Sequence, residues 1–148
     1  MASMIDEYFE YIERLLNIDI IFDIKPTFEN DSICGKVIDG KIIINIKWLN
    51  NTNNEAFLAF LSHEAFHLFQ KEYIKSHNNE LSIKWENEFN NYINPTDDNF
   101  EIYFNQSIER TATAFSALVI KKFTNNNLEA SKLLKDEDYD IVKNLINI

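Results

Sequence analysis

Apolar residues along this chain recur with two different periods, and the change of period separates expected helices from expected strands. Between residues 3 and 16 they are three or four apart, which predicts an amphipathic helix that ends at Asn17. From Ile18 to Ile24 apolar residues alternate with others, which predicts a strand with one face buried. Pro26 is expected to stop this strand, because proline cannot donate a hydrogen bond to a sheet.

Two further apolar runs, Ile33–Ile38 and Lys41–Ile46, are separated by the dipeptide Asp39-Gly40. Both positions of a two-residue hairpin turn need positive φ, which Asp and Gly tolerate, so the pattern predicts a β-hairpin. The single cysteine, Cys34, lies in the first of these runs. We expect it to be a small buried residue, since one cysteine cannot form an internal disulfide.

The rest of the chain predicts helices joined by short polar segments. The first is apolar nearly all round from Ala56 to Phe69 and continues to about Tyr73, which is typical of a helix in a protein core. The segment Thr52-Asn53-Asn54-Glu55 predicts a capping box at its start. A second helix is expected over residues 80–92, with Glu86 and Glu88 on a solvated face.

A third helix is expected from about Glu109 to about Phe123, broken by the asparagines that begin at Asn125. Two short helices then finish the chain. Their core-facing residues are expected to be Leu133, Leu134, Ile141, Val142 and Leu145.

The long helix carries His63-Glu64-Ala65-Phe66-His67, which reads H-E-x-x-H. Histidines four residues apart leave the same face of a helix about one turn apart, so the two imidazoles can hold one zinc ion. Glu64 lies beside them as a candidate general base. The pattern is short and also arises by chance in unrelated helices, so a third ligand is needed to support a metal site.

Two residues are candidates for that third ligand. His77, the only other histidine, lies in a polar segment just past the long helix, where a solvated loop residue is expected. Glu109 instead opens a second apolar helix, whose small residues allow a close approach to the first. These small residues are Ala112, Thr113, Ala114 and Ser116. An acid in the first turn of a helix is also favoured by the helix dipole alone, but beside the first motif the pattern favours Glu109 as a ligand.

Together the two motifs, His63-Glu64-Ala65-Phe66-His67 and the segment that runs Glu109-Arg110-Thr111-Ala112-Thr113-Ala114-Phe115, resemble the gluzincin metallopeptidases. That signature is H-E-x-x-H followed on a later helix by a glutamate ligand, often as E-x-x-A-x-x-F. The small single-domain forms, the minigluzincins and the ImmA/IrrE-like peptidases, are similar in layout over roughly residues 1–125.

The resemblance implies a zinc ion held by His63, His67 and Glu109, with Glu64 as the general base that activates water. It implies one zincin-like α+β domain over residues 1–148, with a short twisted antiparallel or mixed sheet and the two motif helices packed together. The expected activity is that of a zinc-dependent peptidase, an endopeptidase acting on a peptide or protein substrate, with one strand bordering the substrate.

At one position the chain departs from the pattern of these families. They often carry Asp or Asn four residues after the ligand glutamate, where it can orient a ligating histidine, and this chain has Thr113 there. A hydroxyl is a weaker partner than a carboxylate. The donor that stabilises the oxyanion is often Tyr or His. Tyr103 and Tyr92 are candidates here and His77 is a weaker one, but for each tyrosine the pattern favours a role as a packing aromatic.

Composition agrees with one globular, intracellular domain. The 148 residues are 45% apolar, which is enough for a core. The net charge of −10, with no basic stripe, argues against nucleic-acid binding. The acidic start is unlike a signal peptide, and no apolar run is long enough to cross a membrane, so a cytoplasmic protein is expected.

Two other classes of function remain open from the sequence. The chain could be a catalytically inactive zincin-fold module that binds or regulates a partner. Alternatively, the histidine motif could be accidental in a helical interaction protein. Glu64 favours the enzyme over the inactive module, because a structural metal site needs its ligands but no general base.

Overall fold

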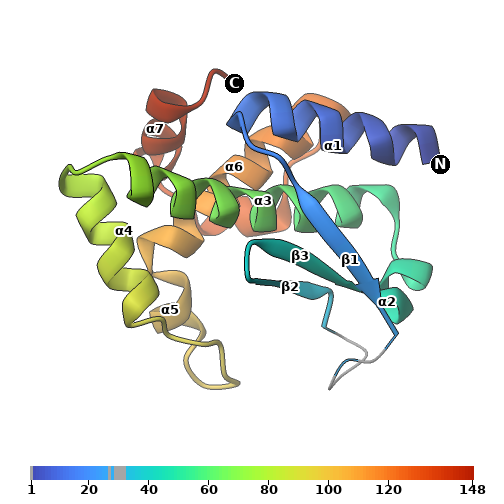
Figure 1. Ribbon diagram of the computed structural model, residues 1–148, viewed down its shortest axis with the longest axis horizontal. Coiled ribbons are helices and arrows are strands. Elements are labelled where there is room, and N and C mark those ends of the chain that lie inside the picture. The colour runs from blue at the N-terminus through green and yellow to red at the C-terminus, as the bar shows by residue number, and fades with distance from the viewer. Residues whose placement is uncertain (1, 27, 29–32) are drawn as a thin grey trace.

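A three-stranded sheet lies beside a group of packed helices in the computed structural model, which describes the backbone of residues 2–26, 28 and 33–148 and the side chains from residue 5 onward (Figure 1). The predicted α+β class is confirmed. In chain order the elements are α1 (Ala2–Leu16), β1 (Ile21–Lys25), β2 (Gly35–Ile38), β3 (Lys41–Asn45), α2 (Ile46–Asn51), α3 (Asn54–Ser76), α4 (Glu80–Asn90), α5 (Phe100–Phe104), α6 (Ser107–Thr124), the 3₁₀ turn η1 (Glu129–Leu133) and α7 (Asp136–Leu145).

The sheet is mixed, with strand order β1-β3-β2. β2 and β3 form the predicted hairpin, in which Ile38 pairs with Lys41 across the turn. Asp39 and Gly40 have φ angles of 50° and 78°, the positive values that this turn requires. β1 pairs in parallel with the other side of β3, so β1 and β2 are both edge strands.

The prediction that the first strand buries one face is wrong. All five residues of β1 are exposed, including Phe22 at 44% and Ile24 at 46%. Phe22 contacts Phe9 of α1, with ring centroids 4.8 Å apart, but little else covers the strand. The apolar face of the sheet is supplied by the central strand instead, because Ile42 and Ile44 of β3 are almost completely buried.

Cys34 also differs from its prediction. It lies just before β2 and is half-buried, not buried inside the strand. Its carbonyl accepts a hydrogen bond of 2.9 Å from the backbone N–H of Asn45, which joins the entrance of β2 to the end of β3.

α3 is the long apolar helix expected from the sequence, but its cap differs by one residue. Asn53 is the N-cap, and its side chain accepts a hydrogen bond of 2.8 Å from the N–H of Ala56. The third helical position is therefore Ala56, so Glu55 cannot complete the predicted capping box. Glu55 instead accepts a hydrogen bond from Asn126, just beyond the end of α6.

α3 and α6 pack directly against each other and form the centre of the core (Figure 1). Serines allow this close approach, as predicted for the small residues of α6. Ser116 of α6 donates to the carbonyl of Ala59, and Ser62 of α3 donates to the hydroxyl of Ser116, both at 2.9 Å. Phe66 and Phe115 stack beside them with ring centroids 5.1 Å apart.

The first turn of α6 is held from two sides. Glu88 of α4, predicted to be solvated, accepts hydrogen bonds from the hydroxyl of Ser107 and the backbone N–H of Ile108. A half-buried acid can satisfy these free N–H groups at a helix start, so Glu88 caps α6. On the opposite side Arg110 pairs with Asp138 of α7 at 2.8 Å.

The end of the chain packs on α6 mainly through α7, in which Val142 is completely buried. Leu133 was expected to face the core, but it is 48% exposed at the end of η1. The short 3₁₀ turn places it on the outside, since consecutive positions of so tight a turn cannot all face inward. None of the helices in the described part of the chain is long and apolar enough to cross a membrane.

The contact between α3 and α6 can be tested by enlarging one of its small residues. Ser116→Leu is expected to lower the free energy of unfolding by about 2–4 kcal/mol, because it overfills the interface and removes two hydrogen bonds. Chemical denaturation measures this loss. The matched variant Ser76→Leu, at an exposed position near the end of α3, should change stability by no more than about 0.5 kcal/mol. Equal effects of the two variants would contradict the close packing.

Candidate metal centre

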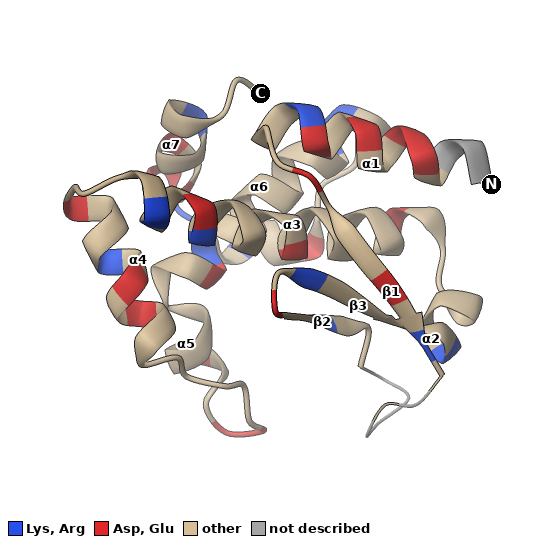
Figure 2. Ribbon diagram, viewed as in Figure 1, with Lys and Arg blue, Asp and Glu red and all other residues tan. Residues whose placement is uncertain are grey.

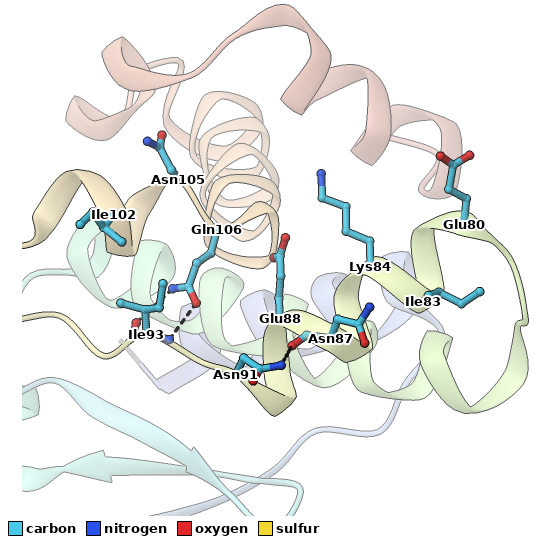
Figure 3. A pocket seen from close by; sticks show the side chains of 10 residues that line it. All are labelled: Glu80, Ile83, Lys84, Asn87, Glu88, Asn91, Ile93, Ile102, Asn105 and Gln106. Atoms are coloured by element: carbon cyan, nitrogen blue, oxygen red, sulfur yellow. Dashed lines mark hydrogen bonds between the residues drawn. The ribbon is translucent and has the colours of Figure 1, made fainter.

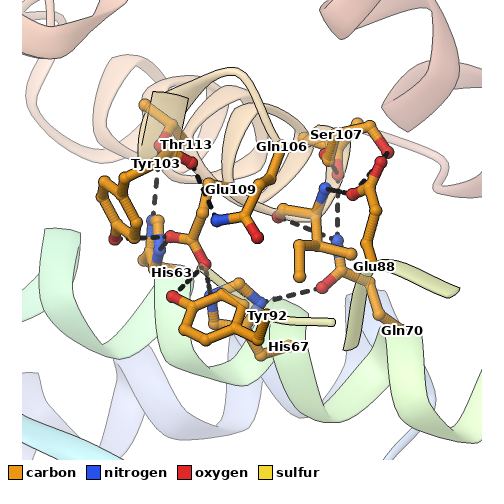
Figure 4. Close-up of polar contacts among 12 residues, drawn as sticks. His63, His67, Gln70, Glu88, Tyr92, Tyr103, Gln106, Ser107, Glu109 and Thr113 are labelled. Carbon is orange, nitrogen blue, oxygen red and sulfur yellow. Dashed lines mark hydrogen bonds and ion pairs between the residues drawn. The ribbon is translucent and has the colours of Figure 1, made fainter. Parts of the chain in front are cut away.

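His63 and His67 lie one turn apart on the face of α3 that meets α6 (Figure 4). Their rings are 4.8 Å apart, centroid to centroid, at an angle of 84°. The predicted pairing of the two imidazoles is therefore present, and its cause is the helical spacing of four residues. His67 is only 9% exposed.

Glu109, in the first turn of α6, brings its carboxylate between the two histidines. One oxygen, Oε1, lies 3.1 Å from Nε2 of His63, and the other, Oε2, lies 3.1 Å from Nε2 of His67. The side chain of Glu109 is 2% exposed. A buried carboxylate needs such partners, because an unpaired charge inside a protein is very costly.

These three residues could hold a metal ion, since one ligand atom from each lies within 4.8 Å of the others. Ligand atoms that share one tetrahedral ion at bond lengths near 2.0 Å are separated by about 3.3 Å. The nitrogen-to-oxygen distances of 3.1 Å are close to that value. Two imidazoles and a carboxylate are also a donor set that transition metals prefer, so the residues present fit the predicted metal.

Gln70 fixes the orientation of His67. Its Oε1 accepts a hydrogen bond of 2.8 Å from Nδ1 of His67, while its Nε2 donates to the carbonyl of Ile108 and to the hydroxyl of Thr111 on α6. Because the amide nitrogen is used by α6, the carbonyl oxygen must face His67, and Nδ1 must carry the proton. That tautomer leaves Nε2 as the metal-binding atom.

Gln70 was not among the site residues predicted from the sequence. A signal for it was present, because Gln70 lies three positions after His67, on the same face of the helix, directly after the apolar stretch that ends at Phe69. It is completely buried. A buried amide requires partners, and the nearest groups on that face are those of the motif itself.

Thr113 takes the position predicted for a partner of a ligating histidine, and that histidine is His63. Its hydroxyl lies 3.5 Å from Nδ1 of His63, which is a long contact at the limit of hydrogen bonding. His63 is therefore held less firmly than His67, in agreement with the weaker partner expected from a hydroxyl. The side chain of His63 is also the more exposed of the two, at 22%.

Tyr92 and Tyr103 both reach the carboxylate of Glu109. The hydroxyl of Tyr103 donates to Oε1 at 2.7 Å, and that of Tyr92 donates to Oε2 at 2.9 Å. From the sequence, the two tyrosines were predicted to be either hydrogen-bond donors to a substrate or packing residues. Their hydroxyls bond to a predicted metal ligand instead.

The close contacts change the acidity of the whole group. Burial acts to lower the pKa of His67, but the hydrogen bond and charge of Glu109 outweigh it and raise the pKa from 6.5 to about 9. Burial opposes ionisation of Glu109, yet the hydrogen bonds from His63 and His67 hold the pKa of this carboxyl well below its usual range. Burial and the charge of Glu109 raise the pKa of Tyr92 and Tyr103, so both phenols remain protonated donors.

Glu64, the predicted base, lies on α3 next to the histidines and is half-buried. Among the described residues it forms no hydrogen bond or ion pair, so its carboxylate is not committed to another side chain. Two causes raise the pKa of the Cys34 thiol: burial, which is the larger, and the negative charge of Glu64.

His77 is not part of the cluster, as the sequence indicated. It is exposed after the end of α3, where its ring stacks on Tyr73 at 3.9 Å. A pocket in the described part of the chain is also separate from the cluster. It has a volume of about 580 Å³ between α4 and the start of α6, and its lining includes Ile83, Ile93 and Ile102 but none of the predicted site residues (Figure 3).

Comparisons with protein-family models, with curated proteins and with solved structures found no match to this chain. What the cluster can do therefore follows from its donor atoms and their surroundings. Two imidazole nitrogens and one carboxylate, held between two packed helices, can bind a metal ion. The ion and protons then compete for the same nitrogen atoms.

Metal binding to this cluster should release a proton from His67. Because Glu109 raises the pKa of His67 to about 9, the imidazole is protonated at pH 7 and a metal must displace that proton from Nε2. We expect release of roughly one proton per ion at pH 7, and affinity that rises up to about pH 9 and then levels off. Isothermal titration calorimetry in buffers of different ionisation enthalpy measures the release. Binding heats that do not depend on the buffer would contradict it.

Proposed function

We propose that this protein is a zinc-dependent peptidase of the gluzincin type. The observation that carries the proposal is the convergence of His63, His67 and Glu109, whose ligand atoms lie within 4.8 Å of one another. Zinc is favoured over other metals because two imidazoles and one carboxylate are a frequent catalytic zinc set, with a fourth position left for water or substrate.

Glu64 supplies a general base, which a structural metal site does not need. A bound zinc ion supplies a Lewis acid that polarises the scissile carbonyl and makes water more acidic. Glu64 takes a proton from the attacking water as its oxygen bonds to the carbonyl carbon. It then gives this proton to the departing amine as the carbon–nitrogen bond breaks. The absence of a partner for Glu64 among the described residues supports this role.

An extended peptide is the substrate that the surroundings fit. β2 is an edge strand, and no described strand pairs with its outer side. The entrance of β2 lies against α3, because a Cβ added to Gly35 would come within 2.7 Å of the Phe60 ring, one turn before Glu64. A peptide added alongside β2 would be held by backbone hydrogen bonds next to the proposed base.

The distribution of charge agrees with a protein substrate more than with a nucleic acid. In Figure 2 the Lys and Arg residues are scattered over several elements and do not form a stripe, while acidic residues follow one another along α1. Phosphate backbones are bound by clustered basic residues, and the view shows no such cluster near α3 and β2.

Removing the base should separate catalysis from metal binding. Glu64→Gln keeps the size of the side chain but cannot accept the proton, so we expect peptide cleavage to fall by about 10²–10⁴-fold with zinc content unchanged. A quenched-fluorescent peptide library gives the cleavage rate, and elemental analysis gives the zinc. Glu72→Gln, an exposed acid further along the same helix, serves as the control and should cleave as wild type does. Zinc binding without cleavage in wild type would instead indicate a zincin-fold binding module.

A further inference from the structure

We propose that Tyr92 and Tyr103 form a phenol clamp, a pair of positioning residues that orients the Glu109 carboxylate for metal binding. This inference rests on the proposed metal site, but it assigns the two tyrosines to the ligand and not to the substrate. The clamp joins three parts of the chain, because Tyr92 lies in the segment after α4, Tyr103 lies on α5 and Glu109 lies in the first turn of α6.

The geometry of the carboxylate supports the clamp. Each oxygen of Glu109 accepts one phenol and also faces one histidine: Oε1 contacts Tyr103 and His63, and Oε2 contacts Tyr92 and His67 (Figure 4). A carboxylate has about four acceptor positions, two on each oxygen. The phenols occupy one on each, and the two Nε2 atoms lie within 3.1 Å of the same oxygens.

Two hydroxyls that meet on one carboxylate are not explained by ring packing alone. The rings of Tyr92 and Tyr103 do touch edge to face, with centroids 6.4 Å apart, and phenylalanines could make the same contact. A phenylalanine has no hydroxyl, so it could not donate a hydrogen bond to the Glu109 carboxylate. Glu has three rotatable side-chain bonds, and a ligand that is already in the correct rotamer loses less entropy when it binds.

A buried amide holds both tyrosines in place. Gln106, the N-cap residue of α6, accepts from the N–H of Ile93 at 2.9 Å and donates to the Ile93 carbonyl at 3.0 Å. Its Nε2 also donates to the carbonyl of Tyr103 at 2.9 Å. The residue that follows Tyr92 and the backbone of Tyr103 are thus tied to the same turn that carries Glu109.

The three predicted ligands differ in how closely neighbouring side chains hold them. His67 is oriented by Gln70, whereas the Thr113 hydroxyl is 3.5 Å from His63. Glu109 accepts from two phenols, and such partners of ligands commonly change metal affinity by 10–100-fold.

The test uses Tyr92→Phe, Tyr103→Phe and the double variant, which keep the rings and remove only the hydroxyls. Zinc affinity, measured by competition with a chromophoric chelator, should fall by about 10-fold in each single variant and about 100-fold in the double variant. Tyr73→Phe is the control and should bind zinc as wild type does, because the Tyr73 hydroxyl contacts Asn79 and not the cluster.

A spectroscopic measurement separates positioning from general loss of structure. In the cobalt-substituted protein the visible absorption depends on how Glu109 binds the ion, so it should change in both clamp variants and not in Tyr73→Phe. The two single variants test the clamp independently, so one that does not fold leaves the other informative.

The outcomes distinguish the clamp from the proposed function. If wild type binds zinc and the clamp variants bind it equally well, the clamp is overturned and the metal site stands. If those variants lose only turnover, the hydroxyls act on the substrate, which also overturns the clamp. If the wild-type protein takes up no zinc, both the proposed metal site and the clamp are ruled out.

Discussion

The burial of the Glu109 carboxylate is the constraint on which the rest of the structure depends. An ionised acid that is 2% exposed must be compensated by nearby donors, because its desolvation alone costs several kcal/mol or more. Two histidines and two tyrosines supply that compensation. They come from α3, α5 and the segment after α4, so one carboxylate determines how these elements meet.

The close packing of α3 and α6 makes this arrangement possible. Ser62 and Ser116 bring the helix backbones together and bond to each other and to α3 carbonyls. Glu88 then caps α6 from α4, and Gln70 joins His67 to the first turn of α6. Each of these groups fixes the turn that carries Glu109. Metal affinity and fold stability are therefore coupled, since both depend on the same buried polar contacts.

The parts predicted from sequence are those that local periodicity determines. The spacing of His63 and His67 follows from the helical repeat, and the hairpin turn follows from the positive φ that Asp39 and Gly40 accept. Glu109 could be predicted because it begins an apolar helix rich in small residues. Roles that depend on tertiary placement could not be predicted. The alternation of apolar residues does not reveal that β1 is an exposed edge strand. Nothing in the local sequence distinguishes Glu88, which caps α6, from a solvated acid.

The metal content of the purified protein tests the central claim most directly, with wild type measured beside Glu109→Ala. Wild type is predicted to contain about one zinc ion per chain, and Glu109→Ala to lose it or bind it much more weakly. Glu101→Ala, which removes an exposed acid on α5, should retain the zinc. A wild-type protein without zinc, even after reconstitution, would contradict the account and leave His63, Glu64 and His67 as parts of a binding module.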